Sequence, residues 1–271
     1  MNAAAGPWWV RWLFPPRCQG CARLGPEPLC AACLATIPLS LLPRCEICGA
    51  WFDPLASARR CAECRRRPDG QQLVARAAAA HEGITRRLVL RYKYQRRHTA
   101  GAALGLLWAA WLAADSEAVA ALGLTDALLV PVPLHRRRER WRGFNQALSL
   151  AESLAAVCDA PVVEALVRTR PTRPQVRLSG AQRERNVKGA FNLAEVSLNR
   201  ARTYVLVDDV YTTGATLREC ARTLRRAGAR EIRAVTVARP VSAELVELAR
   251  RLSEGSEVYS GTSATSVGSS P

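Results

Sequence analysis

The sequence contains almost no lysine. Lys93 and Lys188 are the only two among 39 basic residues, so arginine carries nearly all of the formal net charge of +16. Because alanine is also abundant, this bias resembles a compositional trend of the source genome and is weak evidence of function. The net positive charge still favours anionic partners, either phosphorylated metabolites or nucleic acid.

Long hydrophobic runs are absent as well. No stretch approaches the ~20 apolar residues of a transmembrane helix, and the aromatic segment Trp8–Phe14 is short and interrupted by Arg11. The cysteine pairs that follow it are typical of a reducing compartment, which argues against a secretory signal. We therefore expect residues 1–17 to form a short helix packed on the body of a cytoplasmic protein with no membrane insertion.

Eight of the ten cysteines form four Cys-x-x-Cys pairs: Cys18/Cys21, Cys30/Cys33, Cys45/Cys48 and Cys61/Cys64. Each pair can place two thiolates on one metal ion, and two pairs complete the tetrahedral sulfur shell that Zn²⁺ prefers. A disulfide framework would belong to a small secreted domain, and a redox Cys-x-x-Cys would normally occur once. We therefore predict a double zinc-ribbon module over residues 18–68 that binds two structural zinc ions.

The pairing of these motifs is open, since four pairs can combine in three ways. We favour sequential pairing, first with second and third with fourth. A segment this small buries too little surface to fold alone, so metal binding would supply its folding free energy. The remaining cysteines, Cys158 and Cys220, fall in helical patterns and are expected to be small core residues.

The most informative stretch runs from Tyr204 to Thr216. An apolar run leads directly into Asp208 and Asp209, and a loop of hydroxyl residues and one glycine then opens an amphipathic helix over 217–227. A buried parallel strand would deliver both carboxylates to the edge of a sheet where open α/β folds bind ligands. Acidic oxygens there suit ribose hydroxyls or hydrated Mg²⁺, and backbone N–H groups at a helix N-terminus suit a phosphate. The weaker alternative is an ordinary strand followed by an N-capped helix.

Two basic segments offer further anion sites. The apolar run 127–133 ends in prolines and is followed by the basic, glycine-containing segment 134–146, which includes Arg142. A buried strand that ends in such a loop favours a second anion site, and the alternative is a solvated charge run. Residues 170–191 predict a mobile loop leading into a short helix, with Arg183 and Lys188 available as a lid over a phosphorylated ligand.

Periodicity predicts the elements between these motifs. The alanine-rich run 72–83 fits either a strand or a buried helix. Residues 84–94 predict a helix whose interleaved basic and aromatic residues fit either a nucleic-acid surface or a solvated face. Apolar residues over 101–122 predict one long core helix in which Trp108 and Trp111 serve packing.

The chain is long enough for one α/β domain, expected over 72–252, beside the cysteine module. A strand over 232–237 and an amphipathic helix over 242–252 would complete this domain. The segment 253–271 is rich in Ser, Gly and Thr and is expected to be a disordered tail.

Several of these motifs together resemble one known family. The stretch from Tyr204 to Thr216 resembles the phosphoribosyl diphosphate (PRPP) signature of type I phosphoribosyltransferases. With the cysteine module, the V-P-V-P-L-H and R-G-F-N-Q-A sequences within 130–147, and the segment 173–191, the chain is similar to the ComF family of bacterial competence proteins over about residues 8–240. The resemblance implies a double zinc ribbon joined to an α/β domain with a type I phosphoribosyltransferase-like parallel sheet flanked by helices.

The resemblance also implies roles for residues. The two acids would hold the ribose 2′- and 3′-hydroxyls of PRPP, the Thr/Gly loop would hold its 5′-phosphate, and Mg²⁺ would neutralise the pyrophosphate. The implied PRPP-binding residues are Asp208, Asp209, Thr212, Thr213, Gly214, Ala215 and Thr216. Arg142 and nearby residues, or Arg183 and Lys188, would cover the pyrophosphate. Tyr211 stands where such loops usually carry an aliphatic or polar residue, and it alters what stacks beside the loop.

Two functions fit this resemblance. The first is a phosphoribosyltransferase, linked to natural competence and DNA uptake, in which an unidentified acceptor displaces pyrophosphate from C1 of PRPP. Positioning and electrostatics would supply most of its catalysis, since no residue identifies itself as a general base. The second is a non-catalytic PRPP- or nucleotide-sensing module that binds single-stranded DNA or a DNA-uptake helicase. Steeply salt-dependent binding to single-stranded DNA would favour the second.

Overall fold

The computed structural model describes residues 15–39, 43–52, 58–94, 98–172 and 179–242, together with residues 245 and 247. The predicted helix over 1–17, the predicted last helix over 242–252 and the predicted tail over 253–271 lie wholly or almost wholly outside these residues.

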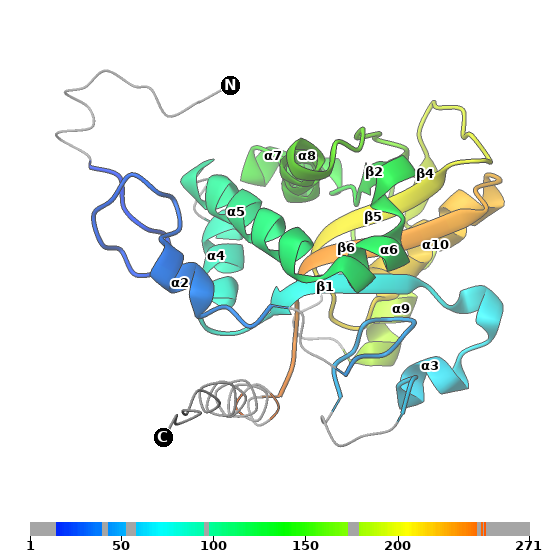
Figure 1. Cartoon of the computed structure of the whole chain (residues 1–271). Coiled ribbons are helices and arrows are strands. Elements are labelled where there is room, and N and C mark those ends of the chain that lie inside the picture. Colours follow the sequence, from blue (N-terminus) through cyan, green and yellow to red (C-terminus); the bar gives the residue numbers. More distant parts are fainter. Residues whose placement is uncertain are drawn as a thin grey trace, which may run out of the picture.

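A four-stranded parallel sheet forms the centre of the molecule (Figure 1). Its strands are β1 (Val74–Ala80), β2 (Ala127–Pro131), β5 (Thr203–Val210) and β6 (Glu231–Arg239), in the order β1-β6-β5-β2. The alanine-rich run is therefore a strand, and almost all of β1 is buried. Short apolar side chains suit a strand that is covered on both faces. A separate antiparallel pair consists of β3 (Leu166–Arg168) and β4 (Phe191–Leu193).

Helices cover both faces of the sheet, as the fold prediction requires (Figure 1). One face carries α4 (Gly83–Tyr94), α5 (His98–Ala114), α6 (Ser116–Leu122) and α8 (Gln146–Cys158), which share one apolar core with the sheet. The other face carries α10 (Ala215–Arg226), against which α9 (Gly180–Val187) and β4 lie. Two single 3₁₀ turns, Asp69–Gln71 and Leu124–Asp126, precede β1 and β2.

The prediction of one helix over 101–122 is wrong, because the chain breaks at Asp115. Helices α5 and α6 meet at an angle of 99°. The Asp115 carboxylate accepts a hydrogen bond from the Ala118 N–H at 2.9 Å, as an N-cap does, and also forms an ion pair with buried Arg44. Trp108 and Trp111 are fully buried and contact each other, as predicted for packing residues. No single helix of the described chain is both long and apolar enough to cross a membrane.

The basic segment after β2 is a helix rather than the predicted loop. Residues Arg136–Arg142 form α7, with His135 as its N-cap. Arginine and glutamate are good helix formers, and Gly143 ends the helix in the left-handed region at φ 87°. Asn145 then caps α8 by accepting a hydrogen bond from the Ala147 N–H at 3.1 Å. The loop is thus reduced to residues 134–135 before α7 and residues 143–145 between α7 and α8.

Two cysteine ribbons precede the sheet. In each, the third cysteine is the N-cap of a five-residue helix: Cys30 for α2 (Ala31–Ala35) and Cys61 for α3 (Ala62–Arg66). The first ribbon lies beside α4 and α5, whereas the second lies near α9 (Figure 1). Segments of both contact the outer side of β1. Leu39 pairs with Ala79 in an antiparallel bridge, and the Ala75 N–H donates to the Ile47 carbonyl at 2.8 Å.

Candidate functional site

Two adjacent carboxylates stand at the carboxyl end of the central strand β5. The Asp209 N–H donates to Asp208 Oδ1 at 2.8 Å, and Lys93, at the end of α4, places its Nζ 2.9 Å from Asp209 Oδ2. Burial, together with the neighbouring charge of Asp209, raises the pKa of Asp208 to about 7. The pair therefore carries less than two full negative charges near neutral pH and is partly balanced by one ammonium group.

The loop Thr212–Thr216, the phosphate loop, joins this acidic pair to α10. Gly214 is the N-cap of α10 and has φ +71°. A Cβ atom at this position would lie 2.3 Å from the Tyr211 hydroxyl and 2.8 Å from Arg218 Nη1, so only glycine fits. Thr213 Oγ1 accepts from the Ala215 N–H at 3.4 Å. The loop thus presents backbone N–H groups at a helix N-terminus, an arrangement that suits a phosphate.

Two cavities meet at the acidic pair. The cradle cavity, of about 190 Å³, lies over the phosphate loop and is lined by Lys93, Arg183, Asp208–Thr212 and Gly214–Leu217. The arginine cavity, of about 350 Å³, lies over α7 and the start of α8; its lining includes Val132–Leu134, Arg138, Trp141, Arg142, Asn145–Ala147 and Arg168. Lys93, Asp208, Asp209 and Thr216 line both. An elongated ligand can therefore lie across the carboxylates with one end in each cavity.

Hydrogen-bond donors line the arginine cavity. Gln146 is only 2% exposed, its Oε1 accepts from Arg142 Nη1 at 2.5 Å, and its Nε2 has no partner within the described chain. Arg168 also has a buried Nε without a partner there, and burial lowers the pKa of its guanidinium. Buried N–H groups without acceptors are costly, so this cavity suits a ligand rich in anionic oxygens.

The structure brings most of the predicted site residues together. Arg183 lines the cradle cavity and Arg142 lines the arginine cavity, each beside the acidic pair. Lys188 lines none of the cavities described here: it is exposed at the end of α9, where its carbonyl accepts from Arg170 Nη2 at 2.7 Å. Thr213 faces a third cavity instead of the cradle.

Sequence reasoning did not name Lys93, Arg168 or Gln146 as PRPP-binding residues. Lys93 was visible as one of two lysines in the chain, but its contact with Asp209 depends on how α4 packs. Arg168 lies on the short strand β3, which carries no motif. Gln146 lies inside a quoted motif, and its burial beside a basic cavity marks it as a binding residue only in three dimensions.

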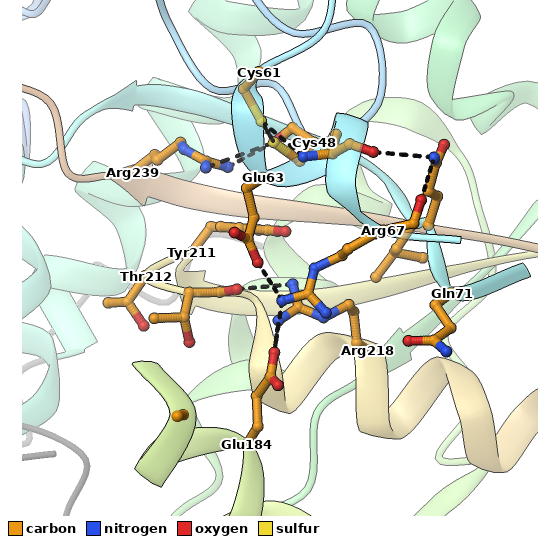
Figure 2. Close-up of a pocket in the computed structure, with 15 residues that line it drawn as sticks. Cys48, Cys61, Glu63, Arg67, Gln71, Glu184, Tyr211, Thr212, Arg218 and Arg239 are labelled. Atoms are coloured by element: carbon orange, nitrogen blue, oxygen red, sulfur yellow. Dashed lines mark hydrogen bonds and ion pairs between the residues drawn. The ribbon is translucent and has the colours of Figure 1, made fainter. Parts of the chain in front are cut away.

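A third cavity, the ribbon cavity, separates the second ribbon from the phosphate loop. It has a volume of about 420 Å³, and its lining includes Cys48, Cys61, Glu63, Cys64, Arg67, Glu184, Tyr211, Thr212, Thr213, Arg218 and Arg239. Figure 2 shows Arg67, Arg218 and Glu184 meeting in this space. Glu184 Oε1 lies 2.7 Å from Arg67 Nη2 and 2.6 Å from Arg218 Nη2. One carboxylate of α9 thus joins the second ribbon to α10.

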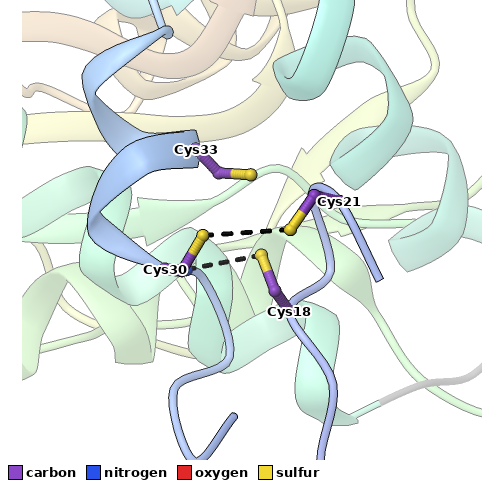
Figure 3. A group of neighbouring side chains, drawn as sticks. All are labelled: Cys18, Cys21, Cys30 and Cys33. Atoms are coloured by element: carbon purple, nitrogen blue, oxygen red, sulfur yellow. Dashed lines mark hydrogen bonds between the residues drawn. The ribbon is translucent and has the colours of Figure 1, made fainter. Parts of the chain in front are cut away.

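The eight ribbon cysteines gather into two groups of four, in the sequential pairing that was favoured. Figure 3 shows the first group, Cys18, Cys21, Cys30 and Cys33; the second is Cys45, Cys48, Cys61 and Cys64. Within each group the sulfur atoms lie within 4.8 Å of one another. Four thiolates at this spacing fit a tetrahedral Zn²⁺ with no open coordination position, which indicates a structural role.

Backbone donors support the thiolate form of Cys18 and Cys45. The Cys30 N–H points at Cys18 Sγ at 3.3 Å, and the Cys61 N–H points at Cys45 Sγ at 3.4 Å. Burial acts against ionisation of Cys18, but backbone hydrogen bonds from Cys30, Cys21 and Gly20 lower its pKa to about 6. Outside the ribbons, Cys220 is fully buried, and partly buried Cys158 packs against the core, as predicted.

Comparison with known proteins agrees with this architecture. A double zinc ribbon family model matches residues 9–65, and a phosphoribosyl transferase domain model matches residues 145–258. Competence protein F of Haemophilus influenzae is 33% identical over 226 residues, covering 82% of this chain and 95% of that protein. DNA utilization protein YhgH of Escherichia coli K12 is 33% identical over 215 residues, covering 78% and 90%. Competence protein ComFC of Bacillus subtilis is 36% identical over 108 residues, covering 37% and 39%.

These matches extend over the ribbons and the sheet together, with both cysteine groups and the phosphoribosyltransferase-like domain in one chain. The chain belongs to the ComF family of competence and DNA utilization proteins.

Proposed function

We propose that this protein binds PRPP with Mg²⁺ across the cradle and arginine cavities and transfers the phosphoribosyl group to an acceptor. The phosphate loop would hold the 5′-phosphate, and Asp208 and Asp209 would accept hydrogen bonds from the ribose hydroxyls. Arg142, Arg168 and Gln146 would donate to the pyrophosphate, with Arg183 closing the cradle. The observation that carries the proposal is that two cavities suited to phosphates meet at one acidic pair.

The reaction would be a substitution at C1 of the ribose. A bond forms between the acceptor nucleophile and C1, the C1–O bond to pyrophosphate breaks, and its electron pair leaves with the pyrophosphate. When bound, Mg²⁺ would neutralise negative charge on this leaving group. The protein contributes by holding the ribose through the carboxylates and by stabilising the developing negative charge with the donors of the arginine cavity.

Calorimetry with PRPP and Mg²⁺ tests the binding step. We expect the wild-type protein to bind and the Asp208→Asn/Asp209→Asn double variant to lose binding. Asp126→Asn, which changes a carboxylate next to β2 and away from both cavities, is the control and should bind normally. Failure of the zinc-loaded, folded wild-type protein to bind PRPP would contradict the proposal. Pyrophosphate release on addition of candidate acceptors then tests transfer.

One observation favours the second function, binding of single-stranded DNA. Trp141 on α7 is 66% exposed, and the same helix carries the exposed arginines Arg136, Arg137 and Arg140. An exposed aromatic ring among cations suits base stacking beside a phosphate backbone. The relatives are named for competence and DNA utilization, and we propose a cytoplasmic role in DNA handling. Steeply salt-dependent DNA binding that Trp141→Ala weakens would support it, and unchanged binding by that variant would contradict the role of α7.

A further inference from the structure

One arginine contacts both the second ribbon and the residue that precedes the phosphate loop. Arg239, at the end of β6, donates from Nη1 to the Cys48 carbonyl at 2.6 Å, and its Nη2 lies 3.7 Å from Cys48 Sγ. Figure 2 shows Arg239 reaching Cys48 across the ribbon cavity. The same guanidinium lies over the Tyr211 ring, 4.2 Å from its centroid. One side chain therefore touches both a metal-ligating residue and the residue that precedes the phosphate loop.

Tyr211 carries this contact into the loop. Its side chain is 4% exposed, and its N–H donates to the Ala238 carbonyl at 2.9 Å. Its hydroxyl occupies the space that a side chain at position 214 would need. A displacement of the ring would therefore move Gly214, the N-cap of α10, and with it the N–H groups that face a phosphate.

The first ribbon is connected differently. Its buried residues Cys18, Leu29, Cys33 and Ile37 pack into the core with α4 and α5, and none of its described residues lines the cradle, arginine or ribbon cavity. It also contacts α4, where Arg91 Nη1 donates to the Gln19 carbonyl at 2.5 Å, two residues before Lys93. The second ribbon lines the ribbon cavity with three of its four cysteines and with Arg67. The two metal sites thus differ in what they can transmit to the ligand site.

We propose that Arg239 is a positioning residue that couples the second zinc site to the phosphate loop, so that metal loading of this site, and not of the first, sets the affinity for a sugar phosphate. This inference rests on the proposed function, because the coupled site is the PRPP cradle. Coupling is reciprocal, so a ligand in the cradle should also alter the environment of the second metal.

The first test compares Arg239→Met with Arg225→Met in the full chain. Arg225 is a matched control, since it is also half-buried and also donates to a backbone carbonyl of the N-terminal region, that of Gln72 at 2.9 Å. We expect Arg239→Met to keep both zinc ions and bind PRPP about tenfold more weakly, and Arg225→Met to bind like wild type. Equal affinities for Arg239→Met and wild type would overturn the inference.

A second pair of variants covers the case in which Arg239→Met fails to fold. Tyr211→Leu removes the ring under Arg239 but leaves the contacts with Cys48, whereas Tyr211→Phe keeps the ring and removes only the hydroxyl. Tyr211→Leu should weaken PRPP binding about tenfold with zinc retained, and Tyr211→Phe, which keeps the ring under Arg239, should weaken it less. Wild-type affinity in Tyr211→Leu would overturn the inference.

Replacing zinc with cobalt(II) makes the metal sites visible by their absorption spectrum. If Arg239 had only a structural role, a ligand in the cradle would not change this spectrum. PRPP should change the visible absorption of the cobalt thiolates in wild type and leave it unchanged in Arg239→Met. Ribose 5-phosphate, which needs only the cradle, is the second probe. A cobalt response to ribose 5-phosphate without PRPP binding would refute the proposed function and retain the coupling. Binding of either ligand without a cobalt response would refute the coupling alone, and binding of neither would refute both.

Discussion

The two ribbons share one local design and differ in where they dock. Each pairs two Cys-x-x-Cys motifs in sequence, and in each the third cysteine caps a short helix. The first ribbon is packed into the core beside α4 and α5, whereas the second faces the phosphate loop across the ribbon cavity. The comparison teaches that a repeated metal motif need not have a repeated role, because the surface it docks against decides what it can influence.

Removing one metal site at a time is the strongest test of whether the two ribbons differ in their effect on PRPP binding. Cys30→Ser and Cys61→Ser are matched in position, since both residues are half-buried and each occupies the N-cap position of a five-residue helix. Each variant should lose one zinc ion. We expect Cys61→Ser to weaken PRPP binding by about 30-fold and Cys30→Ser to change it little. Calorimetry and zinc analysis on the same samples would measure this, and equal losses of affinity would refute the distinction.

The pH dependence of PRPP binding should report on the protonation of Asp208, and the first ribbon should not affect it. Its pKa of about 7 means that it takes up a proton as the pH falls through neutrality, and a protonated carboxyl is a poorer acceptor for ribose hydroxyls. Binding should therefore weaken about tenfold between pH 8 and pH 6. Asp209, Lys93 and Arg168 also influence this carboxyl, so Asp208→Asn is the control that should abolish the profile. Cys30→Ser should retain it, because no described residue of the first ribbon lines the cradle or arginine cavity.

The same proton has the opposite effect on the stability of the unliganded protein. Between pH 4 and pH 7 the folded state holds a proton on Asp208 that the unfolded state has released, so the free energy of unfolding should fall as the pH rises through this window. Thermal melting of wild type and Asp208→Asn would measure the difference. A melting temperature of wild type that rises relative to Asp208→Asn over this window would contradict the assignment.

A smaller effect is expected where the second ribbon contacts α9. Glu184→Gln should loosen the contacts with Arg67 and Arg218 and weaken PRPP binding about threefold, because Glu184 is partly exposed and such pairs contribute little. Glu63→Gln is the control. It also removes a partner of Arg67, but one within the ribbon itself. Calorimetry should show a loss for Glu184→Gln only, and equal affinities for both would indicate that the contact does not position α9.

The smallest effect on PRPP affinity should come from adding a methyl group at a closely packed glycine in each ribbon. A Cβ atom at Gly49, which has φ +66°, would lie 2.7 Å from the Ala75 carbonyl oxygen, and one at Gly20 would lie 2.7 Å from Cys33 Sγ. Gly49→Ala should destabilise the protein by about 1–3 kcal/mol and weaken ligand binding up to about twofold. Gly20→Ala should disturb only the first metal site and leave affinity unchanged. Melting curves with calorimetry would separate the two, and a loss of affinity in Gly20→Ala would contradict the comparison.

Structural features that depend on residues close together in the sequence could be predicted. The order of strand, acidic pair, loop and helix around Asp208 is local, so its chemistry follows from neighbouring residues. The pairing of the cysteines and the family resemblance also depend on motifs. The bend at Asp115 was not predictable, because it depends partly on Arg44, 71 residues earlier. The identity of β1 as a strand depends likewise on its pairing with β6, which comes near the end of the described chain.

The candidate site likewise contains residues that local motifs identify and residues that only packing brings together. The residues of the acidic pair and the phosphate loop could be named from the sequence, whereas the contact of Lys93 with Asp209 and the position of Arg168 beside the pair depend on packing. Lys188 is the reverse case, since this basic residue of the predicted lid lines none of the three cavities, whereas Arg183 lines the cradle cavity. Charge and proximity in sequence therefore identified the segment but not which of its side chains lines a cavity.

The contacts between the ribbons and β1 have a consequence for solubility. β1 is an outer strand of the sheet, with β6 on one side only, and Leu39 and Ile47 supply backbone partners on its other side. An uncovered outer strand of this kind is a template for edge-to-edge association between molecules. Loss of zinc, by unfolding the ribbons, would therefore be expected to make the protein aggregate even while its sheet remains intact.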